Sequence, residues 1–169
     1  ISTNTLSKNA SLLFWTLVLR SSNVQNNKLA FLDNVFVEMD LPDRVIVKEK
    51  DILICVRNGS KQLIGKCALI DKKTEGAAFG AFMSLYRSDF SEIVFYQFQS
   101  NIIQKQINET LGATINQITN KDLASFLIPL PPTKAEQTAI ATALSDADAL
   151  IAGLEKLIAK KKAIKQGAM

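Results

Sequence analysis

Residues 57–73 form a polar and basic segment whose side chains are of the types that bind nucleic acid. The segment has five lysines and arginines and one acidic residue, so its local charge is +4. Arginine and lysine hydrogen-bond the edge of guanine, asparagine and glutamine bond adenine, and serine bonds either base. Five such residues occupy one turn between predicted strands: Arg57, Asn58, Ser60, Lys61 and Gln62. A solvated hairpin tip explains the same composition equally well.

A second polar segment, residues 112–121, carries more side chains of this kind. It includes Thr114, Asn116 and Gln117 and ends on a lysine. It too is explained by nucleic-acid binding or by solvation alone.

Signatures of catalysis are missing from the sequence. There is no histidine, which excludes Ser-His-Asp and Cys-His catalysis and every zinc site that uses histidine. There is no Gly-x-Gly-x-x-Gly loop and no Gly-Lys-Ser/Thr phosphate loop. We therefore expect no catalytic residue, no metal ligand and no cofactor, and an enzyme such as a nuclease or methyltransferase is the less favoured alternative.

Length and composition indicate one ordinary domain with an appended helix. The chain has 169 residues, is 47% hydrophobic, and carries 20 Lys and Arg against 16 Asp and Glu. Its longest apolar stretch is far shorter than the ~20 residues that a membrane span needs. We expect a soluble, cytoplasmic protein that binds no membrane. Cys55 and Cys67 are expected to be reduced thiols in the core, and a redox role is the less favoured alternative.

The first 128 residues read as a mixed α+β domain with an irregular sheet. Apolar runs bounded by turn signals predict strands at 12–19, 35–39, 44–48, 52–56, 63–70 and 79–86. Asn58-Gly59 predicts a tight turn with positive φ angles, and one helix is expected over 91–109, followed by Gly112 as its end signal.

A different architecture begins after the proline cluster at 129–132. Three prolines there can continue neither a helix nor a central strand, and Thr133 with Glu136 forms the pattern of a helix capping box. Apolar residues then recur at heptad spacing along about 30 residues. We expect this stripe to pair with a second helix; the alternative is a helix folded back on its own domain. The predicted pairing residues are Ile140, Leu144, Ala147, Leu150, Ile151, Leu154, Leu157 and Ile158.

These features together resemble the DNA-specificity (S) subunit of type I restriction-modification systems. The most specific motif is Leu127-Ile128-Pro129-Leu130-Pro131-Pro132-Thr133-Lys134-Ala135-Glu136-Gln137, which is similar to the proline-Glu-Gln junction of that family. Asp51-Ile52-Leu53, with Lys50 in place of a glycine, resembles the family's Gly-Asp-Ile-Leu strand. The resemblance extends over about residues 19–169.

The resemblance implies a target recognition domain at 1–128 and a conserved region at 129–169, made of the proline junction and a long helix able to pair as an antiparallel coiled coil. An S subunit has two such halves, so we expect a half-size subunit or a fragment, the second half. By this resemblance the chain is a non-catalytic recognition module that reads one half of a bipartite target in double-stranded DNA. Its partners are the methylation and restriction subunits, and self-pairing or a second recognition half through the helix.

Under this interpretation the two polar segments contact bases. Lys66, Lys72 and Lys73 are then expected at phosphates, where contacts position the domain without reading sequence. The alternative function is a protein-interaction adaptor that pairs through its helix and binds no DNA itself.

Overall fold

The computed structural model describes residues 15–111 and 116–167. Eight short strands precede four α-helices, with 3-10 turns at Ser21–Asn23, Asp43–Val45 and Lys61–Leu63. The strands are β1 (Thr16–Leu19), β2 (Val24–Gln25), β3 (Lys28–Leu29), β4 (Val35–Val37), β5 (Ile52–Cys55), β6 (Cys67–Leu69), β7 (Ala78–Phe79) and β8 (Met83–Tyr86). The helices are α1 (Ser91–Phe98), α2 (Asn101–Thr110), α3 (Asn120–Ser125) and α4 (Lys134–Gly167). The predicted α+β class is confirmed.

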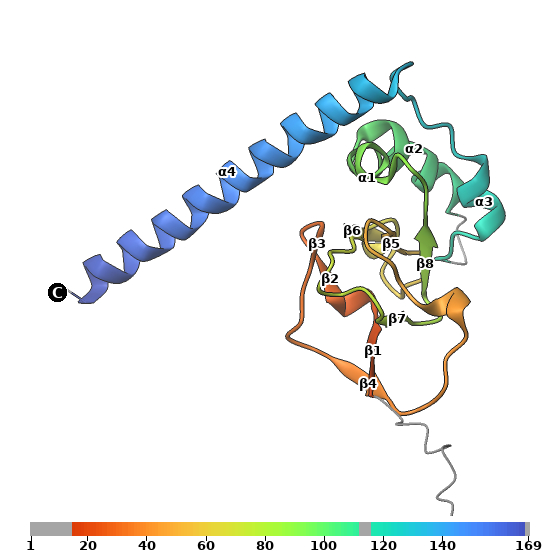
Figure 1. Ribbon diagram of the computed structural model, residues 1–169, viewed down its shortest axis with the longest axis horizontal. Coiled ribbons are helices and arrows are strands. Elements are labelled where there is room, and N and C mark those ends of the chain that lie inside the picture. The colour runs from red at the N-terminus through yellow and green to blue at the C-terminus, as the bar shows by residue number, and fades with distance from the viewer. Residues whose placement is uncertain (1–14, 112–115, 168–169) are drawn as a thin grey trace, which may run out of the picture.

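The central sheet has the order β6-β5-β8 and is antiparallel throughout. All four residues of β5 are buried, because both faces of the sheet are covered. Side chains of a strand alternate between faces. Ile52 and Ile54 accordingly pack toward the helices, whereas Leu53 and Cys55 pack toward β1 and the β2–β3 hairpin. The body is therefore layered, with α1 and α2 on one face and the outer strands on the other (Figure 1).

The outer strands form a second sheet of order β4-β1-β7, in which β1 pairs antiparallel with β4 and parallel with β7. Beside it lies the β2–β3 hairpin, which the sequence analysis did not predict. Its two turn residues, Asn26 and Asn27, have φ angles of 50° and 58°. Asparagine tolerates this left-handed conformation better than most residues, so the Asn-Asn pair was the feature of the sequence that could have predicted the hairpin turn.

An ion pair between a buried carboxylate and a half-exposed arginine holds one end of the central sheet. The carboxylate of Asp51 is 1% exposed and accepts two hydrogen bonds of 2.6 Å from the Arg87 guanidinium. It also accepts a hydrogen bond of 2.7 Å from the backbone N–H of Lys48. The start of β5 is thereby joined to the residue that follows β8.

Four of the predicted elements need correction. The run at 44–48 is not a strand: Asp43–Val45 form a 3-10 turn after Pro42, and only Ile46 makes a single bridge, to Ala78. The run at 63–70 becomes a strand only at Cys67, because a 3-10 turn and Gly65, with φ of 82°, precede it.

The other two corrections divide single predicted elements in two. The run at 79–86 is split into β7 and β8, which belong to different sheets. The helix expected over 91–109 is interrupted at Ser100, whose ψ of 154° is extended and whose hydroxyl bonds the Gln97 carbonyl at 2.7 Å. Ile103 is fully buried, but Ile102 is 53% exposed, so the predicted single apolar face does not exist.

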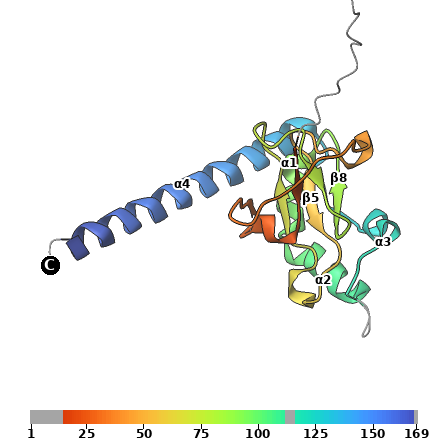
Figure 2. The same ribbon diagram turned by 90° about the horizontal axis from the view of Figure 1, so that it is seen from below.

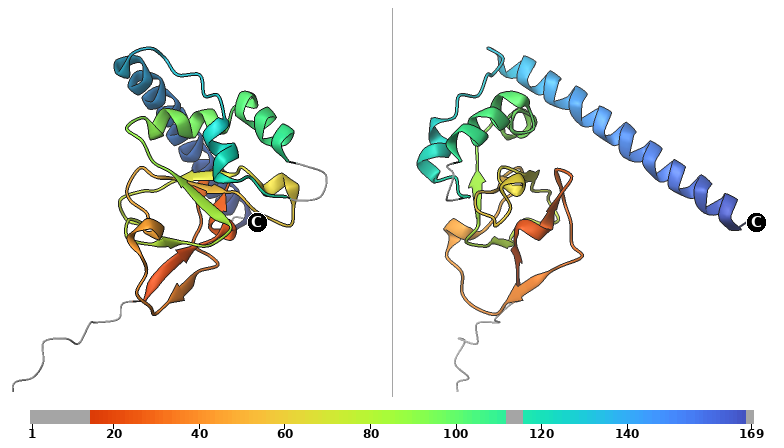
Figure 3. Two further views of the ribbon diagram at one scale, coloured as in Figure 1. Left: turned by 90° about the vertical axis from the view of Figure 1, so that its right-hand side faces the viewer. Right: turned by 180° about the vertical axis from the view of Figure 1, so that it is seen from behind.

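The long C-terminal helix forms as predicted, with 34 residues and a length of about 50 Å. Thr133 and Glu136 exchange the two hydrogen bonds of a capping box, each of 3.2 Å. The helix packs on α1 near its start and then extends away from the body (Figures 1 and 3). Among its described residues only Ala141 is buried, so the alternative of a helix folded back along its length is wrong.

Candidate nucleic-acid interface

The loop at 56–66 joins β5 to β6 at one end of the central sheet, beside α2 (Figure 2). It is longer than the predicted tight turn, and neither Asn58 nor Gly59 has a positive φ. Instead the side-chain oxygen of Asn58 accepts a hydrogen bond of 3.0 Å from the backbone N–H of Ser60. This turn leads into the 3-10 turn at Lys61–Leu63, which displays the polar residues of the loop.

The structure brings the two predicted polar segments together. Arg57 forms a backbone bridge with Gln117, and the Ile118 N–H donates to the Val56 carbonyl at 2.8 Å. The Asn116 side chain donates to the Gly59 carbonyl at 3.1 Å. Residues about 60 positions apart in sequence therefore lie side by side, as a common binding surface requires. Thr114, the third candidate of the second segment, lies outside the described residues.

Some candidate side chains form hydrogen bonds within the fold, whereas others are free at the surface. The amides of Asn58 and Asn116 hold the loops, Asn58 by donating to the Ser21 hydroxyl at 3.1 Å. The Lys61 ammonium donates to the Leu111 carbonyl at 3.3 Å. Of the candidates at 57–62 and 116–117, four are exposed and have side chains that form no hydrogen bond within the described residues: Arg57, Ser60, Gln62 and Gln117.

The three lysines expected at phosphates do not share one surface. The Lys66 ammonium donates to the carbonyls of Ser21 and of Val24, the latter at 2.9 Å, so it braces the loop from inside. Lys72 and Lys73 follow the opposite end of β6. Lys72 pairs with Glu75 there, and the hydrogen bond to that carboxylate raises the pKa of the lysine. The basic segment at 57–73 is thus one stretch of sequence but two places on the molecule.

Two residues at the loop end were missed by the sequence analysis. Phe82, between β7 and β8, is 53% exposed and lies under Arg57, whose guanidinium carbon is 5.2 Å from the ring centroid. Its carbonyl accepts hydrogen bonds from the N–H groups of Val56 and Arg57. Ser21 anchors Asn58. In the sequence Phe82 stands between Ala81 and Met83, so no polar neighbour marked it as a candidate.

The helix α4 leaves its apolar stripe open. The long side chains predicted for pairing are 40–65% exposed. Ala147 is also exposed, so none of the eight predicted pairing residues is buried against the body. About half of the surface of each long side chain is therefore open to solvent.

Cys55 and Cys67 are free and buried, as predicted for core thiols. Burial raises the pKa of the Cys67 thiol to about 12 and also raises that of Cys55. Across residues 15–111 and 116–167, no three metal-binding side chains gather. In the same ranges no helix has the length and apolar character needed to span a bilayer.

Comparison with known proteins agrees with the sequence resemblance. A family model described as the type I restriction modification DNA specificity domain matches residues 17–166. The EcoKI type I restriction enzyme specificity subunit of Escherichia coli K12 is 32% identical over 154 residues, 88% of this chain and 32% of its own length. The StySPI specificity subunit of Salmonella potsdam is 31% identical over 149 residues, 83% of this chain and 32% of its own length.

Solved structures show the same fold. The HsdS subunit from Thermoanaerobacter tengcongensis has a TM-score of 0.65 at 19% identity, over 87% of this chain and 39% of that one. A chain from a study of assembly and conformational transition in the type I R-M system also gives 0.65, at 18% identity, over 83% of this chain and 38% of that one. The chain spans about a third of the length of the curated relatives that it matches. From the match over residues 17–166, this chain belongs to the family of type I restriction modification DNA specificity domains.

Proposed function

We propose that this chain reads the base sequence of one half of a bipartite DNA target, as the specificity element of a type I restriction-modification complex. Methylation and cleavage would be carried out by partner subunits that it directs. The relatives that match it are named specificity subunits of type I restriction enzymes.

The observation that carries this proposal is the meeting of the 57–62 and 116–117 segments at one end of the body. Residues 57–66 include Arg57, Lys61 and Lys66 and no acidic residue. Polar side chains on a rigid turn, surrounded by positive charge, are suited to the base edges and phosphates of duplex DNA. Hydrogen bonds between the two segments fix their geometry before DNA binds.

We assign direct base contacts to the exposed candidates Arg57, Ser60, Gln62 and Gln117. Asn58, Asn116 and Lys66 are expected to act mainly by holding the loop geometry, because their polar groups bond within the fold. Lys72 and Lys73 lie too far along the sheet to share this contact. As phosphate contacts they require DNA that extends past the central sheet, and Thr114 stays a prediction.

The helix α4 supplies the second half of the proposed role. A rigid helix with an open apolar stripe can pair with another helix and so set the distance between two recognition domains at about 1.5 Å per residue. The same helix pair is a surface on which methylation subunits can dock. We propose pairing either with the helix of a second recognition half or with a second copy.

The experiment that tests this function is selection from a randomised duplex library, with and without a co-expressed methylation subunit. Enrichment of one short half-site is expected for the chain alone or in the complex. Enrichment of two half-sites at fixed spacing is expected if two recognition domains are joined through α4. Binding should weaken steeply with salt, since phosphate contacts release counterions.

A folded complex that enriches no sequence would contradict the proposal. That outcome, together with affinity independent of salt, would instead indicate a protein-interaction adaptor that works through α4.

A further inference from the structure

Phe82 leaves an aromatic ring in water beside the base-reading loop. The ring is 53% exposed, although Val56 and Met83 beside it both belong to buried clusters. Burial of the ring in such a cluster would stabilise the fold. Exposed apolar residues that stand singly are common, so the role of Phe82 has to be judged from what surrounds it.

The backbone, not the ring, holds Phe82 at this end of the central sheet. The turn that carries it is tied to β1, since the Gly80 N–H donates to the Leu19 carbonyl at 2.9 Å. The Phe82 carbonyl accepts hydrogen bonds of 3.0 and 3.2 Å from the N–H groups of Val56 and Arg57, directly after β5. Two strand ends therefore fix the place of the ring and leave its exposed face free for a ligand.

The ring lies against the guanidinium of Arg57, whose central carbon is 5.2 Å from the ring centroid. This distance is within the range of a cation–π contact. Within the described residues, Arg57 forms no ion pair. A stacked guanidinium keeps its N–H donors in a fixed plane for a partner. The pair thus presents a fork of donors and an apolar ring side by side.

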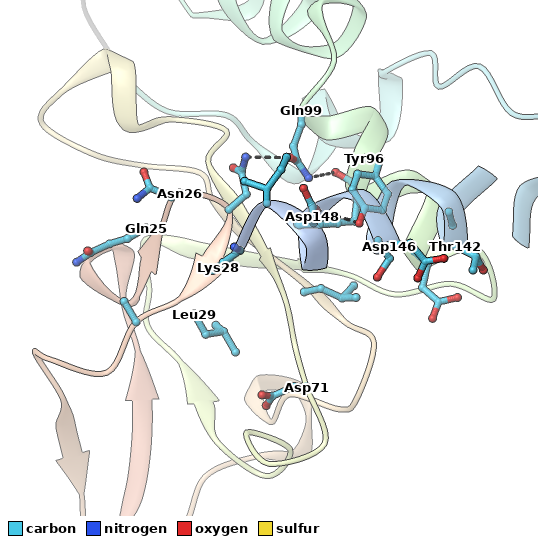
Figure 4. A pocket seen from close by; sticks show the side chains of 18 of the residues that line it. Gln25, Asn26, Lys28, Leu29, Asp71, Tyr96, Gln99, Thr142, Asp146 and Asp148 are labelled. Carbon is cyan, nitrogen blue, oxygen red and sulfur yellow. Dashed lines mark hydrogen bonds between the residues drawn. The ribbon is translucent and has the colours of Figure 1, made fainter. Parts of the chain in front are cut away.

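Charge indicates on which side of the loop DNA lies. An acidic groove between the β2–β3 hairpin, α1 and the first half of α4 borders the β6 edge of the central sheet (Figure 4). Its charged lining has five carboxylates, which repel phosphates, and one lysine: Asp71, Glu92, Asp146, Asp148, Glu155 and Lys28. Residues 76–87, which contain Phe82 and form the opposite edge, include no acidic residue. DNA that contacts Arg57 is therefore expected on the side of Phe82.

We propose that Phe82 contacts the C5-methyl group of a thymine in the major groove, next to the base pair that Arg57 reads. This inference rests on the proposed recognition function and adds a specificity-determining residue to it. The methyl group is the apolar feature of thymine at the major-groove edge, and apolar side chains such as phenylalanine recognise it. Successive bases of a strand are about 3.4 Å apart, so a stacked guanidinium and ring can face neighbouring base pairs.

The contact links two preferences of the half-site. Arginine bonds guanine through two acceptors, O6 and N7, and this geometry requires the guanidinium plane to be held. The Phe82 ring restricts that plane while it covers the methyl group of the adjacent thymine. The half-site should therefore contain a guanine with a thymine as its neighbour, and loss of the ring should weaken both preferences.

The test is competition binding of the full chain to the half-site duplex selected from the randomised library. Each thymine is replaced in turn by deoxyuridine, which pairs with adenine in the same way and lacks only the methyl group. In the unchanged chain, one replacement beside a guanine should lower the affinity about fourfold, the effect of returning one methyl group to water. In Phe82→Ala the same replacement should have no effect. A selected site in which no thymine responds to deoxyuridine, or a response that persists in Phe82→Ala, would overturn the proposal.

Phe82→Leu separates contact with DNA from support of Arg57. Leucine still covers a methyl group but offers no π face to a guanidinium. This variant should retain the preference for thymine over deoxyuridine and lose at least threefold of its preference for guanine. A Phe82→Ala chain that loses only the guanine preference would show that the ring supports Arg57 alone, and would refute the methyl contact.

Phe90→Ala is the matched control. Phe90 follows the other end of β8 and is 40% exposed, so the same substitution removes a similar ring away from the loop. Its preference for thymine over deoxyuridine should equal that of the unchanged chain, and an equal loss in both alanine variants would refute the assignment to Phe82. Urea unfolding checks that the variants are folded. The hydrogen bonds to the Phe82 carbonyl are backbone bonds, so Phe82→Ala retains them.

The result is distinguishable from a failure of the proposed function. A chain that enriches a half-site but shows no deoxyuridine effect would refute the methyl contact and leave DNA recognition intact. A chain that enriches no sequence would refute recognition, and the methyl contact with it.

Discussion

The globular body and α4 solve the problem of burying apolar surface in opposite ways. In the body, both faces of the central sheet are covered, so that Ile52, Leu53 and Ile54 are fully buried. In α4, long apolar side chains such as Leu150 and Ile158 are more than half exposed although the helix is regular along its whole length. The body encloses two buried clusters of its own, whereas the apolar stripe of α4 has no such cluster to join. We therefore expect stability and assembly to be controlled by different residues.

The largest effect is expected when one isoleucine in each region is replaced by alanine. Ile103→Ala empties a fully buried site and is expected to lower the free energy of unfolding by about 2–5 kcal/mol. Ile151→Ala changes a side chain that is 53% exposed and should cost under about 0.5 kcal/mol in the monomer. Urea denaturation of dilute protein measures both values. Equal costs would mean that α4 is covered in the single chain.

Replacing one glycine in each region by alanine is expected to change the stability in opposite directions. Gly65 has φ of 82°, and a Cβ there would lie 2.5 Å from Cδ1 of Ile107, so Gly65→Ala should destabilise the body by about 2–3 kcal/mol. Gly153 lies within α4 with no atom within 4 Å of a Cβ. Gly153→Ala should raise helix content and stability by up to about 1 kcal/mol. Circular dichroism during urea unfolding checks both; loss of stability in both variants would contradict the contrast.

A substitution at Arg57 is expected to change DNA recognition without changing helix pairing. Arg57→Ala should cost about 1–3 kcal/mol of discrimination at one base pair and leave self-association unchanged. Lys73→Ala should weaken binding to all sequences equally and reduce the salt slope by about 1, because a phosphate contact carries no sequence information. Competition binding with single-base variants of the selected site measures these effects. Unchanged preference in Arg57→Ala would refute the base-contact assignment.

The buried thiol of Cys67 predicts that the stability of the protein depends on pH. Burial raises the pKa of Cys67 from 9.0 to about 12, so the neutral thiol favours the folded state. This contribution is complete below pH 9 and is lost as the pH rises toward 12, amounting to about 2 kcal/mol by pH 10.5. Between pH 8 and pH 10.5 the free energy of unfolding, measured with urea, should fall less in Cys67→Ala than in the unchanged protein. An equal loss in both proteins would mean that water reaches the thiol.

The smallest expected difference concerns two capping boxes. Thr119 caps α3 and Thr133 caps α4, each paired with an acid three residues later. Replacing either threonine by alanine should cost about 1 kcal/mol locally. In Thr119→Ala the loss should appear in global unfolding, because α3 packs on the body through Leu123. In Thr133→Ala it should appear as fraying of the first turn, seen by amide hydrogen exchange.

Some features that depend on neighbouring residues were predicted correctly, and others were not. The proline break, the capping box at Thr133 and the heptad stripe of α4 all arise from groups at most seven positions apart, and all are present. The strand at 44–48 failed because Pro42 and Asp43 favour a turn that outweighs β-type side chains. The hairpin at Asn26 and Asn27 was missed for the same local reason, since turn chemistry was not weighed there.

The sequence by itself determined which residue types were present, which chemistry was excluded and where the long helix would begin. It also determined that α4 would carry an apolar stripe, because the 3.6-residue period is a local property. Only the tertiary structure decided that Arg57 would meet Gln117 while Lys72 would lie at the other end of β6, and that acidic residues from α1 and α4 would share a groove. The reason is physical: contacts between distant residues depend on how sheets and helices pack, and no local period encodes that packing.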